Sequence, residues 1–201
     1  MKAVRIALWA SVAVALVAFA ALLLAREKAS EADGTAPVAA YGAPFAATLV
    51  TPEGPQPFRR ADMLGRPHAI FFGFTHCPDV CPTTLYEAGL WLDALGARAE
   101  DLDVYFVTVD PERDTAAVLS DYLRPFDERI RAITGSPDEI ARMAKGWNVH
   151  VSKVPLEGGG YNVDHTASTF LMRADGSLQG TIAYGEDTRT AVAKLRRLAG
   201  G

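Results

Sequence analysis

The fold prediction for this chain rests first on the segment HAIFFGFTHCPDVCPTT, residues 68–84. Its first half, HAIFFGFT, is a nearly continuous apolar run, which is typical of a strand buried on both faces of a sheet. Its second half holds Cys77 and Cys81, the only cysteines in the chain, and leads into a helix predicted over residues 82–98. Both cysteines therefore lie at the carboxyl end of a buried strand, where open α/β sheets place their ligands and their chemistry.

Outward from this junction, strands and helices alternate. A βαβα order that ends in an antiparallel hairpin and a last helix predicts an α/β domain with a thioredoxin-like mixed sheet. Beyond the first strand and helix, the predicted elements are strands at 102–109 and 130–134, helices at 114–123 and 137–146, an extended segment at 148–154, a glycine-rich loop at 155–162, a hairpin of 168–173 and 177–184 with Asp-Gly at its turn, and a helix at 188–198.

Two local patterns complete the prediction for the folded part. Before the buried strand, AATLVTPEG and FRRADMLG predict one short strand, a turn and a short helix. Further on, Ser136 is predicted to cap a helix that has Pro137 in its first position, with Glu139 completing a capping box. Asp114 is interpreted as the amino-terminal cap of the helix predicted over residues 114–123.

The amino-terminal part of the chain differs in composition from the rest. Residues 6–25 carry no charge and lie between Arg5 and Arg26. About 20 helical residues at about 1.5 Å each span the hydrocarbon core of a bilayer, whereas the apolar part of a cleaved signal peptide is shorter. Residues 1–26 are therefore predicted to be an uncleaved membrane anchor, with a long signal peptide as the alternative.

The domain organisation follows from this anchor. Residues 27–43, rich in Ala, Pro and Gly, are predicted to be a flexible linker, and residues 44–201 the folded domain. No amphipathic transit peptide precedes the anchor, which favours a bacterial membrane. With a formal net charge of -4 and no basic stripe, the chain lacks the electrostatic footprint of a nucleic-acid-binding protein.

The cysteine pair has three interpretations: a structural disulfide, a redox couple or a metal site. A disulfide between Cys77 and Cys81 would close a very short loop and so add little stability. A thioredoxin-type redox centre has two residues between its cysteines and commonly a proline before the facing strand. Here three residues intervene, and residues 163–167 carry His165 in place of a proline.

Metal binding suits this set of side chains. A helix amino terminus stabilises a thiolate, so at least one of the two sulfurs is expected to be anionic. Two thiolates and one imidazole form a soft set of low coordination number that suits Cu(I) and can hold Cu(II), whereas zinc usually requires a fourth ligand. Copper is therefore the metal that the residues favour.

The four histidines differ in their positions. His68 stands at the wrong end of the buried strand, and His150 has no neighbouring ligand type and is interpreted as a structural or surface residue. His76 adjoins a cysteine, but successive side chains diverge, so a hydrogen-bonding role is expected. His165 is the best candidate ligand, with Asp164 before it as a carboxylate that would orient the ring.

Three motifs together resemble one known family. FTHCPDVCP at 74–82, VDPERDT at 109–115 and YNVDHTAS at 161–168 are similar to motifs of the Sco (SenC/PrrC) proteins and occur in order behind an apolar segment. The resemblance covers the chain from about Pro44 to its end. It implies a thioredoxin-like domain anchored in the bacterial inner membrane by one helix and facing the periplasm.

The resemblance also implies a function and a ligand set. The family helps to assemble the binuclear copper centre of cytochrome c oxidase subunit II, so that subunit is the implied partner, with other periplasmic copper chaperones or a thioredoxin-like reductant as further partners. Cys77, Cys81 and His165 match the ligands of one copper ion. Asp79 and Asp110 match motif positions beside the site and are interpreted as supporting residues.

Two functions from different classes remain. In the first, the chain is a copper chaperone that binds copper through two Cys and one His and passes it on by ligand exchange. In the second, Cys77 and Cys81 form a thiol-disulfide reductase that keeps the oxidase cysteines reduced, with His165 as a bystander. A peroxidase is a weaker third reading, because a resolving cysteine four residues from a peroxidatic one would be unusual. Whether the chain is an enzyme is left open at this stage.

Overall fold

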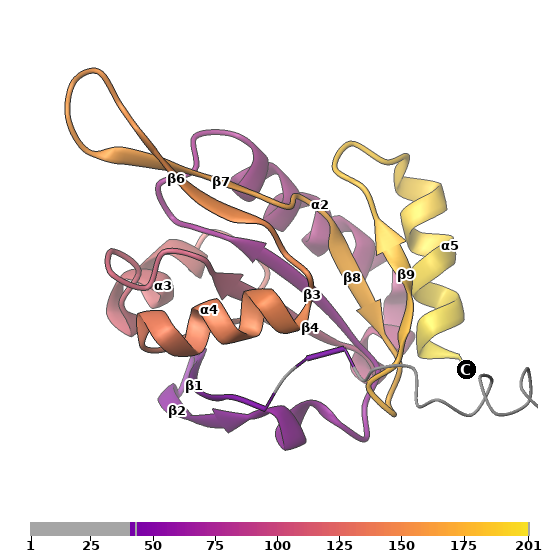
Figure 1. The fold of residues 1–201 in the computed structure, drawn as a ribbon. Coiled ribbons are helices and arrows are strands. Elements are labelled where there is room, and N and C mark those ends of the chain that lie inside the picture. The colour runs from indigo at the N-terminus through magenta and orange to yellow at the C-terminus, as the bar shows by residue number, and fades with distance from the viewer. Residues whose placement is uncertain (1–40, 43, 201) are drawn as a thin grey trace, which may run out of the picture. The chain divides into compact units, whose positions relative to one another are not determined.

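The computed structural model describes residues 41, 42 and 44–200 and contains a large mixed sheet flanked by helices (Figure 1). The strands are β1 (Ala46–Thr51), β2 (Gly54–Arg59), β3 (His68–Gly73), β4 (Asp103–Thr108), β5 (Ile130–Thr134), β6 (Val151–Pro155), β7 (Tyr161–His165), β8 (Thr169–Met172) and β9 (Leu178–Ile182). The α-helices are α2 (Val80–Leu95), α3 (Ala116–Leu123), α4 (Pro137–Gly146) and α5 (Thr188–Ala199), and short 3-10 helices span Arg60–Met63 and Gly96–Asp101.

The strand β3 is the centre of the architecture. Seven strands form one sheet in the order β2-β1-β5-β4-β3-β8-β9, in which β3 is parallel to β4 and antiparallel to β8. Every residue of β3 is buried, because α2 and α5 pack together on one side of the sheet and α4 lies on the other (Figure 1). The predicted buried strand and the α/β architecture are therefore confirmed.

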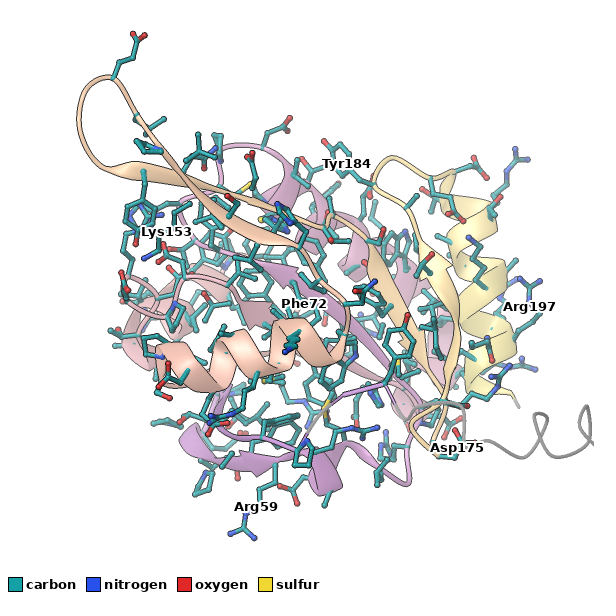
Figure 2. All side chains as sticks on the ribbon, in the orientation of Figure 1. Arg59, Phe72, Lys153, Asp175, Tyr184 and Arg197 are labelled. Carbon is teal, nitrogen blue, oxygen red and sulfur yellow. The ribbon has the colours of Figure 1, made fainter. Side chains whose placement is uncertain are left out.

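Side chains follow the expected division between core and surface (Figure 2). Phe72 of β3 is fully buried, and the charged side chains of Arg59 and Arg197 project outward. The β8–β9 hairpin with its turn at Gly176, which adopts a positive φ of 82°, is also as predicted. A left-handed backbone at this turn favours glycine, so the Asp-Gly pair has a clear physical role.

One strand near the start of the domain was not predicted. The sequence indicated a single strand before the short helix, but β1 pairs with a second antiparallel strand, β2, through a tight turn in which Thr51 faces Gly54. The residues of β2 read GPQPFR, and two prolines argue against an internal strand. They are accommodated because β2 is an edge strand, where a missing N–H faces solvent.

The second missed strand carries the candidate ligand His165. Residues 161–165, predicted as loop and connection, form β7, which pairs with β6 in a separate two-stranded hairpin that projects from the body of the domain (Figure 1). All five residues of β6 are exposed, and its sequence VSKVP does not alternate between apolar and polar residues. The alternation in β7, YNVDH, extends over only five residues next to a glycine-rich loop, so it is a weak signal for a strand. Val151 stands opposite His165 in this pairing.

Two predicted caps differ from the structure. Ser136 caps α4 as expected, accepting a hydrogen bond from the Glu139 N–H at 3.3 Å, but the Glu139 carboxylate accepts from the Ala46 N–H at 3.2 Å instead of completing a capping box. The cap of α3 is Thr115, whose hydroxyl accepts from the Val118 N–H. Asp114 is fully buried and has a different role, described below.

The predicted anchor, residues 1–26, and most of the predicted linker lie outside the described residues. Two linker residues are described, and both contact the domain: the Gly42 N–H donates to the Gly146 carbonyl at 3.0 Å, and the Tyr41 ring lies 6.2 Å from that of Phe170. Packing thus begins slightly before the predicted boundary at residue 44. Across 41–42 and 44–200, no helix combines the length and apolarity needed to cross a membrane.

Candidate metal centre

The two cysteines straddle the start of α2. The Cys77 N–H donates to the Phe74 carbonyl at 3.3 Å, which closes a turn directly after β3. Cys81 lies in the first turn of the helix, and its backbone nitrogen is 3.4 Å from Cys77 Sγ. Both thiols are free; Cys77 is half-buried and Cys81 is completely buried. The four-residue spacing therefore brings one accessible and one inaccessible sulfur together.

His165, at the end of β7, reaches the same place from a distant part of the chain. Its Nε2 atom lies 3.7 Å from Cys81 Sγ, and its ring packs edge-on against Phe74 and Phe71, at centroid distances of 5.8 and 6.2 Å. The Nδ1 atom lies 3.1 Å from the Thr166 carbonyl. Since a carbonyl only accepts hydrogen bonds, Nδ1 carries the proton and Nε2 presents its lone pair to the sulfur.

Burial sets the charge state of this pair. Burial lowers the pKa of His165, against smaller opposite effects of the Thr166 carbonyl and Asp164. Burial also raises the pKa of the Cys81 thiol well above its usual range. The expectation of an anionic sulfur at the helix amino terminus therefore does not hold for Cys81, because loss of hydration outweighs the helix dipole. A neutral imidazole thus faces a protonated thiol.

The space around Cys81 depends on Gly73, the last residue of β3. A Cβ atom at this position would lie 2.8 Å from Cys81 Sγ and 2.6 Å from Phe106 Cε2. Both distances are shorter than a carbon can accept, so only glycine allows the sulfur to sit against the end of the strand. The strand end is thus shaped to hold a buried thiol.

The donor chemistry fits a soft ion. Two sulfurs and one imidazole nitrogen are the ligand types that copper prefers over magnesium or calcium. In the part of the chain that the structure describes, no three Cys, His, Asp or Glu side chains are already gathered closely enough to hold a metal. Cys81 and His165 are already in contact, so binding of a metal ion would require chiefly that the Cys77 sulfur move closer to these two side chains.

Asp110 ties the hairpin that carries His165 to the sheet. Its buried carboxylate accepts a hydrogen bond from the Tyr161 hydroxyl at 2.8 Å and pairs with the Arg113 guanidinium. Arg113 also donates to the Tyr161 carbonyl at 3.1 Å and lies over its ring at 3.9 Å. Because Tyr161 begins β7, this group fixes the strand at whose other end His165 stands.

Asp114 holds the loop that carries the first cysteine. It is completely buried, and its carboxylate accepts from the Thr75 N–H at 3.0 Å, the Thr75 hydroxyl at 2.6 Å and the Thr108 hydroxyl at 2.7 Å. Thr75 lies two residues before Cys77. Sequence reasoning took Asp114 for a helix cap, and no signal separates the two roles, since caps and buried acceptors both follow a strand and precede a helix.

The other two predicted supporting carboxylates are peripheral. Asp79 stands at the cap position of α2 but makes no side-chain cap bond; its carboxylate accepts from the Thr83 hydroxyl at 3.4 Å. Asp164 is exposed, and the His165 ring is oriented by the Thr166 carbonyl instead. The prediction that Asp164 orients this ring is wrong, because adjacent residues of a strand point to opposite faces.

The remaining histidines lie where the sequence placed them. His76 is exposed, with its Nδ1 3.1 Å from the Thr75 hydroxyl and 4.0 Å from Asp114 Oδ1, which fits the expected hydrogen-bonding role. His68 begins β3, at the end opposite the cysteines, and is buried. His150 is exposed and precedes β6.

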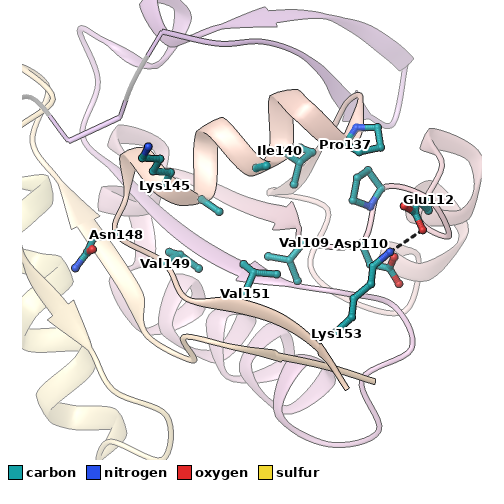
Figure 3. Close-up of a pocket in the computed structure, with 13 residues that line it drawn as sticks. Val109, Asp110, Glu112, Pro137, Ile140, Lys145, Asn148, Val149, Val151 and Lys153 are labelled. Carbon is teal, nitrogen blue, oxygen red and sulfur yellow. Dashed lines mark hydrogen bonds and ion pairs between the residues drawn. The ribbon is translucent and has the colours of Figure 1, made fainter. Parts of the chain in front are cut away.

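A cleft of about 450 Å³ lies beside the donor set, between α4, the loop after β4 and strand β6 (Figure 3). Asp110, Glu112 and Lys153 line one end, where Lys153 Nζ pairs with Glu112 at 2.7 Å, and Val149 and Ile140 line the middle. Neither cysteine nor His165 lines it. The candidate donors therefore lie outside this cleft, with Cys81 buried and Cys77 and His165 half-buried.

Comparison with known proteins relates this chain to one family. A family model described as SCO1/SenC matches residues 33–200. The mitochondrial protein SCO1 of Saccharomyces cerevisiae is 37% identical over 141 residues, which are 69% of this chain and 48% of the yeast protein. The chain thus spans about half the length of this curated relative.

Two solved structures match the described domain more completely. ScoI of Bradyrhizobium japonicum with copper bound is 40% identical, with a TM-score of 0.72, and the match covers 79% of this chain and 99% of that one. Yeast Sco1 with copper bound is 34% identical, with a TM-score of 0.72, and the match covers 81% of this chain and 90% of that one.

Proposed function

This chain belongs to the SCO1/SenC family, as its three motifs predicted, and we propose that it is a copper chaperone whose cargo is bound by Cys77, Cys81 and His165. The contact of 3.7 Å between Cys81 Sγ and His165 Nε2 carries the proposal. A dithiol reductant does not need an imidazole at this position, whereas a copper site with two sulfurs does. Relatives that share the fold have been solved with copper bound.

The burial of the donors suggests an order of uptake. Cys77 is half-exposed and is the first sulfur that an incoming ion can meet. Cys81 keeps its proton until a cation offsets the cost of burying a thiolate, so uptake releases protons from the thiols. His165 is already neutral and oriented and supplies its lone pair without losing a proton. Copper affinity is therefore expected to decrease as the pH is lowered.

Release would reverse these steps by ligand exchange with a recipient. The accessible Cys77 sulfur is the donor that a second set of ligands can displace or approach first. Protonation of the Cys81 thiol after the ion departs favours release, because it restores the neutral pair in a buried environment. We take the recipient to be the binuclear copper centre of cytochrome c oxidase subunit II, and the domain to face the periplasm from a bacterial inner membrane.

Copper loading tests this proposal. The full chain with reduced thiols is loaded with Cu(I) and passed through a desalting column, with Cys77→Ser and Cys81→Ser beside the wild type. One retained copper per chain, with sulfur and nitrogen ligation by X-ray absorption and loss in both variants, is expected. A wild type that retains no copper overturns the proposal.

Thiol-disulfide reduction is the second candidate function. It is favoured by the two free, adjacent thiols, one of them accessible to a substrate disulfide. A reductase would form a mixed disulfide through Cys77, which Cys81 then resolves. It predicts turnover of a disulfide in oxidised subunit II that is unchanged in His165→Ala, whereas the chaperone predicts that this variant loses copper delivery.

A further inference from the structure

The hairpin of β6 and β7, which carries His165, is attached to the rest of the domain at few points. In the part of the chain that the structure describes, its hydrogen bonds to the body of the domain, apart from the contact of His165 with Cys81, all go to residues 110–113. Val163 is the only residue of the two strands that is buried. The orientation of the hairpin, and with it the place of His165, therefore depends chiefly on the segment 110–113.

Arg113 is at the centre of these contacts. Its guanidinium pairs with the buried Asp110 carboxylate, donates a hydrogen bond to the Tyr161 carbonyl at 3.1 Å and has its Cζ atom 3.9 Å from the centroid of the Tyr161 ring. The Tyr161 hydroxyl donates to the same carboxylate at 2.8 Å. A planar guanidinium can donate in its plane while its face covers an aromatic ring, which a lysine ammonium cannot do. Arg113 thus holds the first residue of β7 through both its backbone and its side chain.

The same guanidinium also reaches the aromatic ring against which the His165 imidazole packs. Arg113 Cζ lies 6.0 Å from the centroid of the Phe74 ring, at the outer limit of a cation–π contact. Phe74 is buried, and the His165 ring meets it edge-on at a centroid distance of 5.8 Å. A continuous series of contacts therefore joins Arg113 to His165 by way of Phe74, in addition to the path along β7.

We propose that Arg113 is a positioning residue that keeps His165 Nε2 beside the Cys81 sulfur. It does so by holding β7 at Tyr161 and by supporting the Phe74 ring behind the imidazole. Without the guanidinium, these two elements lose their common contact, and the cost of ordering the hairpin falls on the binding of the ion. The position of His165 in the metal-free chain does not depend on the proposed function, whereas the consequence for copper rests on it.

Nuclear Overhauser effects in the metal-free full chain, with reduced thiols and in detergent micelles, test the position of His165 directly. In the wild type, the ring protons of His165 should show an effect to those of Phe74, because the two rings are in contact. Arg113→Lys keeps a positive charge near Asp110 but cannot make the planar contacts, so this effect should be lost. Tyr161→Leu is the second variant. It leaves Arg113 paired with the buried Asp110 carboxylate, and it should lose the effect as well.

Arg131, near the amino ends of β4 and β5, offers a matched control. It pairs with Asp103 at 2.5 Å and has its Cζ atom 4.9 Å from the centroid of the Tyr105 ring. Its side chain is 28% exposed, and that of Arg113 is 25% exposed. Arg131→Lys should therefore lower the stability to a similar degree and leave the contact of the His165 ring intact. An effect that survives in both test variants, or that is also lost in the control, overturns the inference.

Copper binding provides the second readout. The Cu(I) affinity of Arg113→Lys, measured by competition with a chelator, should fall about tenfold or more, as for residues that support a metal ligand. The nitrogen ligation seen by X-ray absorption should weaken with it. Arg131→Lys should bind copper as the wild type does. An unchanged affinity in Arg113→Lys would overturn the role of this residue at the metal site.

The two readouts separate this inference from the proposed function. If the wild type retains no copper but the contact of the His165 ring is lost in the test variants alone, the chaperone proposal fails and the positioning of His165 by Arg113 stands. If copper is retained and the contact persists in every variant, the positioning inference fails alone.

Discussion

Two histidines at opposite ends of the central strand, His68 completely buried and His165 half-buried, share one hydrogen-bond pattern but differ in what their second ring nitrogen faces. His68 at the start of β3 and His165 beside its end each have Nδ1 close to a backbone carbonyl, at 3.2 Å from Arg66 and 3.1 Å from Thr166. Burial lowers the pKa of both rings. However, Nε2 of His165 faces the Cys81 sulfur, whereas Nε2 of His68 is buried without a partner in the described part of the chain.

The comparison separates two requirements of a metal site: an imidazole in the form that can bind a metal, and a second donor within its reach. Burial and a carbonyl partner leave each imidazole neutral with its lone pair on Nε2, which is the form that binds metals. At the start of β3 the His68 ring packs against that of Tyr105, at a centroid distance of 5.8 Å, and both cysteines lie beyond the other end of the strand. A second soft donor within reach is therefore the property that distinguishes the candidate site.

Replacing each of the two histidines in turn should give the largest difference in copper affinity. His165→Ala should reduce copper affinity by more than about a hundredfold, since losing a ligand costs more than losing a residue that supports one. His68→Gln should leave copper affinity unchanged, because it lies at the opposite end of the strand. Competition with a Cu(I) chelator measures both, and an equal loss in the two variants would contradict the assignment of His165.

The pH dependence of stability should report on His68 next. Its pKa is lowered to about 4 in the folded protein, mainly by burial, from 6.5 in the unfolded chain. The unfolded state therefore binds the proton more tightly, and stability present above pH 6.5 is lost as the pH falls toward 4. The loss is about 3 kcal/mol for a shift of this size.

Urea unfolding at several pH values checks this expectation. The difference in unfolding free energy between wild type and His68→Gln, compared at pH 7 and pH 4, isolates the contribution of this one group. If the two proteins lose stability in parallel as the pH falls, His68 does not titrate as its burial requires.

Asp114→Asn tests how far the loop at the carboxyl end of β3 supports the candidate site. An amide cannot accept from the Thr75 N–H, the Thr75 hydroxyl and the Thr108 hydroxyl at once, so the loop before Cys77 should loosen. We expect a loss of about 2 kcal/mol in unfolding free energy, as for a broken charged hydrogen-bond group, and a smaller loss of copper affinity. Thermal unfolding and chelator competition measure these, and an unaffected melting temperature would count against the network.

Asp164→Asn should have the smallest effect. Its carboxylate is exposed, and the Thr166 carbonyl holds the His165 ring. Copper affinity is expected to stay within about twofold of the wild type, because an exposed charge contributes little. A large loss would show that Asp164 acts on the metal or its ligands in a way that the hydrogen bonds do not reveal.

The elements that were predicted depend on residues close in sequence, whereas the strands that were missed depend on a partner strand. The buried strand, the α4 cap at Ser136 and the Asp-Gly hairpin follow from apolar runs and turn residues that neighbours in sequence supply. The strands β2 and β7 were missed because one carries prolines at a sheet edge and the other pairs with a fully exposed strand. For these, the partner strand decides the structure and the local pattern does not.

The candidate donor set is visible in the sequence: Cys77 and Cys81 are four residues apart at a strand-to-helix junction, and His165 lies in one of the motifs that resemble the family. The burial of these side chains, the carbonyl that orients the imidazole, and the contact of Asp114 with the loop before Cys77 depend on the tertiary structure. The physical reason is that residue type and spacing fix chemistry within one element, whereas burial and charge depend on contacts between elements far apart in the chain.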